Sequence, residues 1–283
     1  MFHFLPYLPQ INLFGYEIPT IPVLTLACVI AYFLIVTFEA KRLKLNLQAS
    51  ILIFFLAFLL YNIFGRILFT TSHIFLHQDF SYQNKLFGLY TNQKVAFGFL
   101  IAQFLAVVIG VYVYEKKDDL KKYFDIVFLA CTSLFFIRIG GALTHYPIGK
   151  ITNSFWGNYY FKNYRHEPAL YEAISLMLIF IIALFIRKKI KTPGFLALII
   201  LAWISFSRII TDFFRGNDLP LKSLSSPTFE GADVSSNFHF KNGLTLNQLA
   251  YSVLFVYALI TIFFTVRRRR EKKDEKTSLE TLK

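Results

Sequence analysis

The stretch "GFLALIILAWISFSRIITDFFRGND", residues 194–218, decides the fold class. Its first twelve residues carry no charge, as expected for the first part of a helix that crosses a lipid bilayer. Arg208, Asp212 and Arg215 then follow at spacings of four and three residues, so they share one face of a helix. Because a charge inside hydrocarbon is costly, such residues indicate either a buried ion pair or a binding site.

The composition of the whole chain is that of a membrane protein. Of its 283 residues, 55% are hydrophobic and 34 are Phe, whereas soluble domains are about 45–50% apolar. The net charge of +13 does not indicate a nucleic-acid partner, because the basic residues lie at the ends of apolar runs. Cys28 and Cys131 fall within apolar runs, which favours packed side chains over a disulfide.

The hydropathy pattern predicts an all-α membrane protein with seven transmembrane helices. The predicted spans are residues 19–38, 48–72, 95–114, 123–143, 168–186, 194–214 and 246–266. The connections on one side of these spans, with the tail, hold 19 Lys and Arg residues, and the connections on the other side hold eight. By the positive-inside rule, the basic side is cytoplasmic, which places the N-terminus outside and the C-terminus in the cytoplasm.

This topology divides the chain into a membrane domain, residues 1–266, and a basic cytoplasmic tail, residues 267–283. The outer side carries an aromatic N-terminal arm and the longer loops, and loops of this kind are where function usually concentrates. The charged segment after Arg270 is predicted to be disordered.

Five ionisable residues inside the spans are predicted to converge on the outer half of the membrane. They come from four helices and are Arg66, Arg138, Glu172, Arg208 and Asp212. Two interpretations are open. The charges can simply pin helices together, as buried ion pairs often do. Alternatively they bind an anion, since guanidinium groups suit phosphate and the abundant anion at this depth is a phospholipid headgroup.

Several motifs, in order, resemble the bacterial prolipoprotein diacylglyceryl transferase family. "RHEPALYEA" (165–173) is similar to the family's Arg-His-Pro-x-Gln-Leu-Tyr-Glu signature, and "SRIITDFFRGND" (207–218) to its Phe-Arg-x-x-x-Glu-Phe-Phe-Arg stretch. "FDIVFLACTSLFFIRIGGALTHYPIGK" (124–150) resembles the helix that ends in Gly-Arg-Ile-Gly-Asn-Phe-x-Asn-Gly. "GLTLNQ" (243–248) and "FGRILF" (64–69) resemble the family's Gly-Leu-Thr-x-x-Gln and Gly-Ala-Arg-Leu motifs.

The resemblance implies transfer of the diacylglyceryl group of phosphatidylglycerol onto the lipobox cysteine of a prolipoprotein, at the outer leaflet of the plasma (inner) membrane. In that reaction Arg138 and Arg208 would hold the phosphate, Asp212 would orient Arg208, and Glu172 with Tyr171 would shape the headgroup pocket. The implied substrate-binding residues are Arg66, Tyr171, Arg215, His145, His166, Arg165 and Gly140. The implied partners are an anionic phospholipid, the precursor and the membrane, with no metal or other cofactor.

The chain departs from the family's pattern at the start of the third span. Phe97 stands where the family has the histidine that would handle the thiol proton, and Thr144-His145-Tyr146 replaces an Asn-Gly-x stretch. Two functions therefore stay open: an active transferase in which His145 or His166 takes over, or a catalytically silent relative that binds anionic lipid or a lipoprotein precursor. Transport of a small solute is disfavoured, because the charges lie toward one leaflet.

Overall fold

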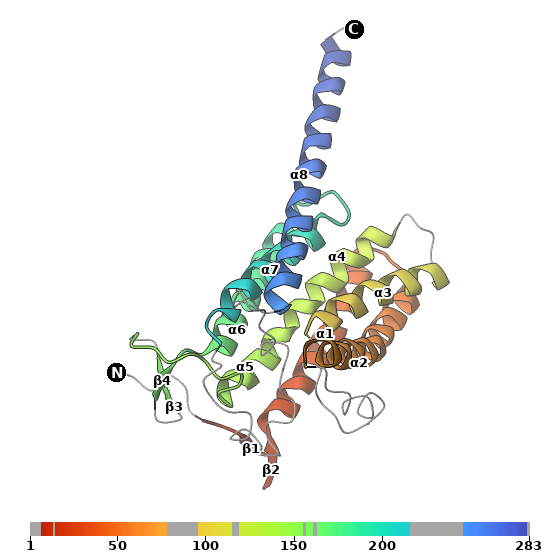
Figure 1. The fold of residues 1–283 in the computed structure, drawn as a ribbon. Coiled ribbons are helices and arrows are strands. Elements are labelled where there is room, and N and C mark those ends of the chain that lie inside the picture. Colours follow the sequence, from red (N-terminus) through yellow and green to blue (C-terminus); the bar gives the residue numbers. More distant parts are fainter. Residues whose placement is uncertain are drawn as a thin grey trace.

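The computed structural model describes residues 7–13, 15–77, 96–114, 119–154, 157–160, 163–215 and 246–281. It is a bundle of helices with two short antiparallel hairpins (Figure 1). The helices are α1 (Thr20–Arg42), α2 (Leu47–His77), α3 (Ala96–Tyr114), α4 (Leu120–Cys131), α5 (Phe135–Leu143), α6 (Pro168–Ile186), α7 (Phe195–Asp212) and α8 (Leu246–Thr281). The hairpins pair β1 (Gln10–Leu13) with β2 (Tyr16–Pro19), and β3 (Asn158–Tyr160) with β4 (Asn163–Arg165).

Six helical stretches in the described part of the chain are long and apolar enough to cross a membrane. One of them runs from Leu120 to Leu143 and joins α4 to α5 through a single 3-10 turn, η3 (Thr132–Leu134). A shorter apolar helix, Gly98–Tyr114, occupies the place of the third predicted span. The helical, multi-pass architecture is therefore confirmed, and the count of seven spans stays a prediction.

The α4–η3–α5 stretch lies at the centre of the bundle. One hydrophobic cluster joins α4, through residues such as Val127, to α1, α2 and α3. A second cluster joins α4, through residues such as Leu129, to α6, α7 and α8. Of the most apolar 18 residues within Leu120–Leu143, 61% are buried, against 11% of the corresponding residues of α8. The other helices therefore leave much of their apolar surface for lipid.

Ionic contacts hold the helix ends on the side of the basic connections, which we call the basic end. Glu39 on α1 forms ion pairs with Arg42 at 2.7 Å and with Arg187 at the end of α6. The Asp125 carboxylate on α4 accepts hydrogen bonds of 2.7 Å from the backbone N–H groups of Gly194 and Ala197. Asp125 therefore caps the N-terminus of α7 from a neighbouring helix.

The prediction of disorder after Arg270 was wrong, because α8 continues as a helix to Thr281. Figure 1 shows this end of α8 projecting beyond the rest of the bundle. Arg267 Nε donates to Glu271 Oε1 at 2.8 Å, one helical turn away. Such pairs, together with the high helix propensity of Lys, Arg and Glu, favour helix in a charged segment.

Both hairpins lie at the opposite end of the bundle, which we call the hairpin end (Figure 1). There the N-terminal arm packs on the end of α5. Leu8 N donates to Leu143 O at 2.8 Å, and Thr20 Oγ1 donates to Leu8 O at 2.5 Å. The Tyr7 ring stacks on His145, with 5.6 Å between ring centroids. The sequence predicted the arm but not its hairpin.

Candidate functional site

A single carboxylate at the hairpin end is surrounded by three arginines. Glu172 lies in the second turn of α6, and its side chain is 3% exposed. Glu172 Oε2 lies 2.7 Å from Arg138 Nε, on α5. Glu172 Oε1 lies 2.6 Å from Arg208 Nη1, on α7, and 3.0 Å from Arg215 Nη2, just beyond α7. Thr211 Oγ1 also donates to Oε1, at 3.2 Å. Glu172 thus joins the ends of three helical segments.

A short extended segment after α5 holds the end of α7 against the start of α6. Lys150 N donates to Phe214 O at 2.8 Å, and His166 N donates to Lys150 O at 3.0 Å. Arg165, which is 1% exposed, donates through Nη1 to Gly149 O at 3.0 Å. A Cβ at Gly149 would collide with the backbone carbonyl of His166, so only glycine allows this close approach. We call residues 149–152 the staple segment.

Among the described residues, the arginine cluster comprises Arg138, Arg208 and Arg215 with the carboxylates Glu172 and Asp212. Asp212 Oδ1 lies 3.2 Å from Arg215 Nε, and these two side chains are 4% and 3% exposed. Within the described part of the chain, Glu172 and Asp212 are thus the carboxylates that contact these arginines. Two of these guanidinium groups line a cavity, and guanidinium suits phosphate and carboxylate groups. The cluster is therefore suited to an anion.

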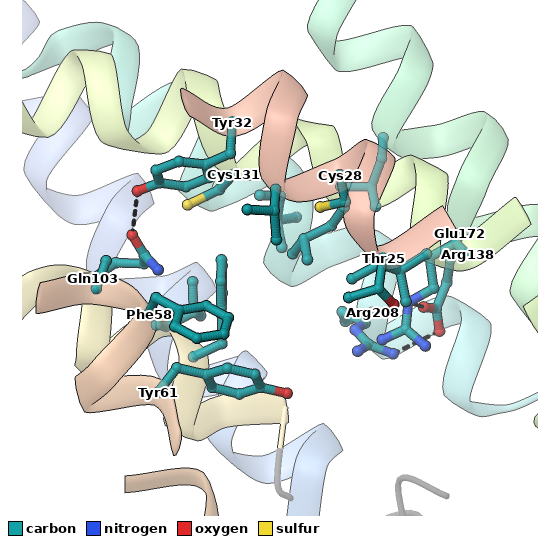
Figure 2. A pocket seen from close by; sticks show the side chains of 18 of the residues that line it. Thr25, Cys28, Tyr32, Phe58, Tyr61, Gln103, Cys131, Arg138, Glu172 and Arg208 are labelled. Atoms are coloured by element: carbon teal, nitrogen blue, oxygen red, sulfur yellow. Dashed lines mark hydrogen bonds and ion pairs between the residues drawn. The ribbon is translucent and has the colours of Figure 1, made fainter. Parts of the chain in front are cut away.

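The cluster opens onto a cavity of about 260 Å³. Arg138, Arg208 and Glu172 lie at one end of it, beside Thr25 of α1 (Figure 2). The Arg138 and Arg208 side chains are 19% and 12% exposed, whereas Arg215 is 3% exposed. The first two arginines therefore face the cavity, and Arg215 lies behind them.

Most of the cavity wall is apolar, and it comes from helices on both sides of the centre. The apolar lining residues are Val29, Phe54, Ala57, Phe58, Phe99, Leu100, Leu134, Ile137, Leu176 and Ile204. Tyr251 on α8 also lines the cavity, and its ring centroid lies 5.8 Å from the Arg208 guanidinium carbon, a cation–π distance. The cavity thus combines a cationic end with a wall suited to hydrocarbon.

A few polar side chains line the other end of the cavity. Tyr32 on α1 donates to Gln103 Oε1 on α3 at 2.5 Å. Cys28 and Cys131 are free, buried and part of the wall, which confirms that the two cysteines are packed side chains. The sequence did not predict this polar end; its only signal was a glutamine inside an apolar run.

The structure brings together five of the residues that the sequence singled out: Arg138, Glu172, Arg208, Asp212 and Arg215. Of the five residues predicted to converge from four helices, all but Arg66 are thus found together, with Arg215 in addition. The expectation that Asp212 orients Arg208 stays a prediction. The side chain of Arg66 lies outside the described residues.

His166 and Tyr171 belong to an aromatic group beside the cluster. His166 Nδ1 lies 3.0 Å from Tyr171 Oη, and the ring centroids of His166 and Phe214 are 4.8 Å apart. Burial, together with the nearby Lys150 ammonium group, lowers the pKa of His166 below its ordinary value. The imidazole is therefore neutral near pH 7.

His145 forms a buried pair with Glu167. Nδ1 of His145, which is 5% exposed, lies 2.6 Å from Glu167 Oε1. Burial raises the pKa of Glu167, and the contact with His145 partly offsets this. Neither His145 nor His166 is among the described residues that line the cavity, so their proposed role in proton transfer stays a prediction. Sequence reasoning missed Glu167, although it stands where the family signature has Pro.

Two further predicted residues contact other parts of the chain. A Cβ at Gly140 would lie 3.3 Å from Leu24 Cδ1 and 3.6 Å from Ile21 Cα, so Gly140 lets α5 pack closely on α1. Arg165 binds the staple segment. Neither Gly140 nor Arg165 is among the described residues that line the cavity. Their role in substrate binding therefore stays a prediction.

The position of the missing histidine lies at a close helix crossing. Phe97 is at the start of α3, and its side chain lies outside the described residues. A Cβ on the next residue, Gly98, would lie 2.8 Å from Gly65 Cα on α2. The two glycines therefore bring the backbone before Arg66 against the start of α3.

Comparison with known proteins extends the resemblance over nearly the whole chain. A family model described as prolipoprotein diacylglyceryl transferase matches residues 10–265. Curated proteins named phosphatidylglycerol–prolipoprotein diacylglyceryl transferase are similar to this chain: one from Aliarcobacter butzleri is 31% identical over 172 residues, 56% of this chain and 60% of that protein. Another, from Campylobacter lari, is 27% identical over 169 residues, 59% of this chain and 54% of that protein. The chain thus matches between half and three-fifths of the length of these relatives.

Proposed function

Because the chain belongs to the prolipoprotein diacylglyceryl transferase family, we propose that it moves the diacylglyceryl group of phosphatidylglycerol onto the cysteine thiol of a prolipoprotein. The names of the relatives state both substrates. The observation that carries the proposal is the position of two arginines, Arg138 and Arg208, at one end of a cavity whose wall is mostly apolar. A phospholipid offers the matching pair of an anionic phosphate and hydrocarbon chains.

The chemistry is an alkyl transfer to sulfur. The thiolate of the precursor cysteine attacks the glycerol carbon that bears the phosphate, so that a carbon–sulfur bond forms and the carbon–oxygen bond breaks. The electron pair stays on the phosphate oxygen, and glycerol phosphate leaves. Negative charge therefore develops on the leaving phosphate, and fixed cationic donors beside it lower the barrier.

The residues of the cluster divide this task by position. Arg138 and Arg208 face the cavity and donate to the phosphate, for which the planar guanidinium is well suited. Glu172 binds both arginines and holds them in place. Arg215, which does not line the cavity, contacts Glu172 and also pairs with Asp212. The apolar wall excludes water, which strengthens these contacts.

The topology that we propose places this site at the outer leaflet of the plasma membrane. Seven spans, with the N-terminus outside, put the basic end in the cytoplasm, in agreement with the bias of Lys and Arg. The site then lies at the hairpin end, on the side where secreted precursors emerge. A fluorescent protein fused after Lys283 should fluoresce and an alkaline phosphatase fusion there should be inactive; the reverse pattern contradicts this topology.

Transfer is tested with the purified chain in vesicles that contain phosphatidylglycerol, plus a lipobox peptide with one cysteine. We expect a peptide whose mass increases by one diacylglyceryl group through a thioether. Arg208→Ala should abolish the product, because it removes a phosphate donor. Arg187→Ala is the matched control: its side chain also pairs with a buried glutamate, Glu39, but at the basic end.

The alternative function, a silent relative, predicts a different outcome in the same vesicles. The observation that favours it is Phe97, at the position of the family's histidine. In that case the chain binds phosphatidylglycerol in an Arg208-dependent manner but forms no thioether. Restoring the residue in Phe97→His would then be expected to create activity. If Arg208→Ala keeps both lipid binding and transfer, the cluster has only a structural role.

A further inference from the structure

A buried side-chain amide faces the end of the cavity remote from the arginines. Gln103 on α3 is 2% exposed and lines the cavity. Its Oε1 accepts a hydrogen bond from the Tyr32 hydroxyl on α1. Within the described residues, its Nε2 has no acceptor. Figure 2 shows the amide oxygen directed at Tyr32 and the amide nitrogen directed toward the open space of the cavity.

An amide in this position is prepared to donate to something that enters the cavity. Buried polar groups in native proteins are nearly always hydrogen-bonded, so an exception calls for a ligand or a water. Tyr32 fixes the orientation of the amide, because its hydroxyl occupies the amide oxygen. The two N–H donors therefore stay turned to the cavity, and the missing partner is an acceptor.

The surroundings define which acceptor fits. Phe54, Phe58 and Leu100 line the same cavity, and these side chains cannot solvate a charged group. Gln103 carries no charge with which to neutralise a phosphate or carboxylate. A carbonyl oxygen attached to hydrocarbon fits both conditions, because it only accepts hydrogen bonds and needs little hydration.

The distance to the arginines fits the same molecule. Thr25 lies beside the arginine cluster, and Tyr32 lies seven residues further along α1 (Figure 2), which corresponds to about 10 Å of helix. The ester carbonyls of a glycerophospholipid are a few bonds from its phosphorus. With a hydrogen bond of about 3 Å at each end, a lipid bridges this distance. The cavity of about 260 Å³ is small for a ligand site, so it holds the polar part of a lipid and the start of a chain.

We propose that Gln103, positioned by Tyr32, binds an acyl ester carbonyl of the phospholipid whose phosphate lies against Arg138 and Arg208. The proposal rests on the proposed function in taking phosphatidylglycerol as that lipid. It adds a second point of recognition, and it makes the site selective for ester-linked over ether-linked chains. An ether oxygen is a much weaker acceptor than a carbonyl and lies one atom closer to the headgroup.

The test compares the binding of phosphatidylglycerol with ester-linked chains and of its ether-linked analogue of equal chain length. Both are measured in detergent micelles without any precursor peptide, so that a peptide carbonyl cannot act as the acceptor. We expect the wild-type chain to bind the ester-linked lipid up to about 10-fold more tightly, the contribution of one or two net hydrogen bonds. In Gln103→Leu this ratio should fall to about one, with the affinity for the ether-linked lipid unchanged.

Other variants separate this proposal from its neighbours. Tyr32→Phe should lower the ratio in part, because the amide is then free to rotate. Gln48→Leu makes the same chemical change on an exposed position of α2 and should leave the ratio unchanged. Arg208→Ala should weaken the binding of both lipids.

The outcomes also separate the subsite from the transfer reaction. A wild-type chain that binds both lipids equally, or a Gln103→Leu variant that keeps the wild-type ratio, overturns the proposal even if thioether is formed. A chain that forms no thioether but shows a Gln103-dependent preference for the ester-linked lipid keeps the subsite and rejects the transferase.

Discussion

Neutralising Glu172 should destabilise the protein more than removing any single arginine. In the wild type, three arginines face Glu172 and Asp212. Glu172→Gln removes the negative charge that all three arginines contact. The amide also offers only one acceptor oxygen in place of two. Its NH₂ group, which is a donor, must replace either the oxygen that contacts Arg138 or the oxygen that contacts Arg208 and Arg215, and these arginines are donors themselves.

The expected cost of Glu172→Gln follows from burial. The Glu172 side chain is 3% exposed, and removing one partner of a buried ion pair costs about 3–5 kcal/mol. At a few degrees per kcal/mol for a chain of this size, that loss corresponds to a fall in Tm of roughly 5–15 °C. The proposed binding of phosphatidylglycerol should be lost as well, because Arg138 and Arg208 lose the group that holds them.

Thermal unfolding in detergent micelles, followed by tryptophan fluorescence, measures this loss. Glu39→Gln is the control, since Glu39 is also buried between two arginines, Arg42 and Arg187, but at the basic end. Its arginines are 34% and 21% exposed, so its effect on Tm should be smaller and lipid binding should be unchanged. A Glu172→Gln protein with wild-type Tm and wild-type lipid binding would refute the reasoning.

Three further outcomes follow from contacts elsewhere in the bundle. Asp125→Ala removes the cap of α7 and should cost about 1 kcal/mol, seen as a lower Tm; an unchanged Tm would mean that water caps the helix equally well. Gly98→Ala places a Cβ 2.8 Å from Gly65 Cα and should lower the free energy of unfolding by about 1–3 kcal/mol. A variant with wild-type stability would show that α2 and α3 can move apart without loss of packing. The lowered pKa of His166 means that its stabilising contribution is complete above pH 6.5 and is lost as pH falls through the folded-state value. The stability of His166→Gln should therefore depend less on pH below 6.5 than that of the wild type; equal pH dependence would contradict this.

The sequence predicted the helices well because each apolar run is long and bounded by charges. The predicted span 168–186 coincides with α6, where Pro168 marks the start and Arg187 follows the end. The prediction was less complete at α2 and α8, which continue past the apolar residues. A hydropathy pattern reports where lipid surrounds a helix, not where its backbone hydrogen bonds end.

The charged cluster was predictable because the cost of burying Arg138 or Arg208 requires a partner at the same depth. The identity of that partner was not, since Glu172 and Asp212 both met the condition. Distances from the fold decide that Glu172 is central. The Gln103 subsite and the His145–Glu167 pair depend on contacts between segments far apart in the chain, which no local pattern encodes.

The way in which Glu172 is shared has a consequence for how this family can diverge. Loss of any one arginine still leaves Glu172 paired with the two others, so the folded state tolerates that loss electrostatically. Loss of the carboxylate has no such compensation. Selection for folding alone therefore preserves Glu172, whereas it permits drift at each arginine. A lineage that does not need the proposed reaction should lose arginines first and keep the glutamate longest.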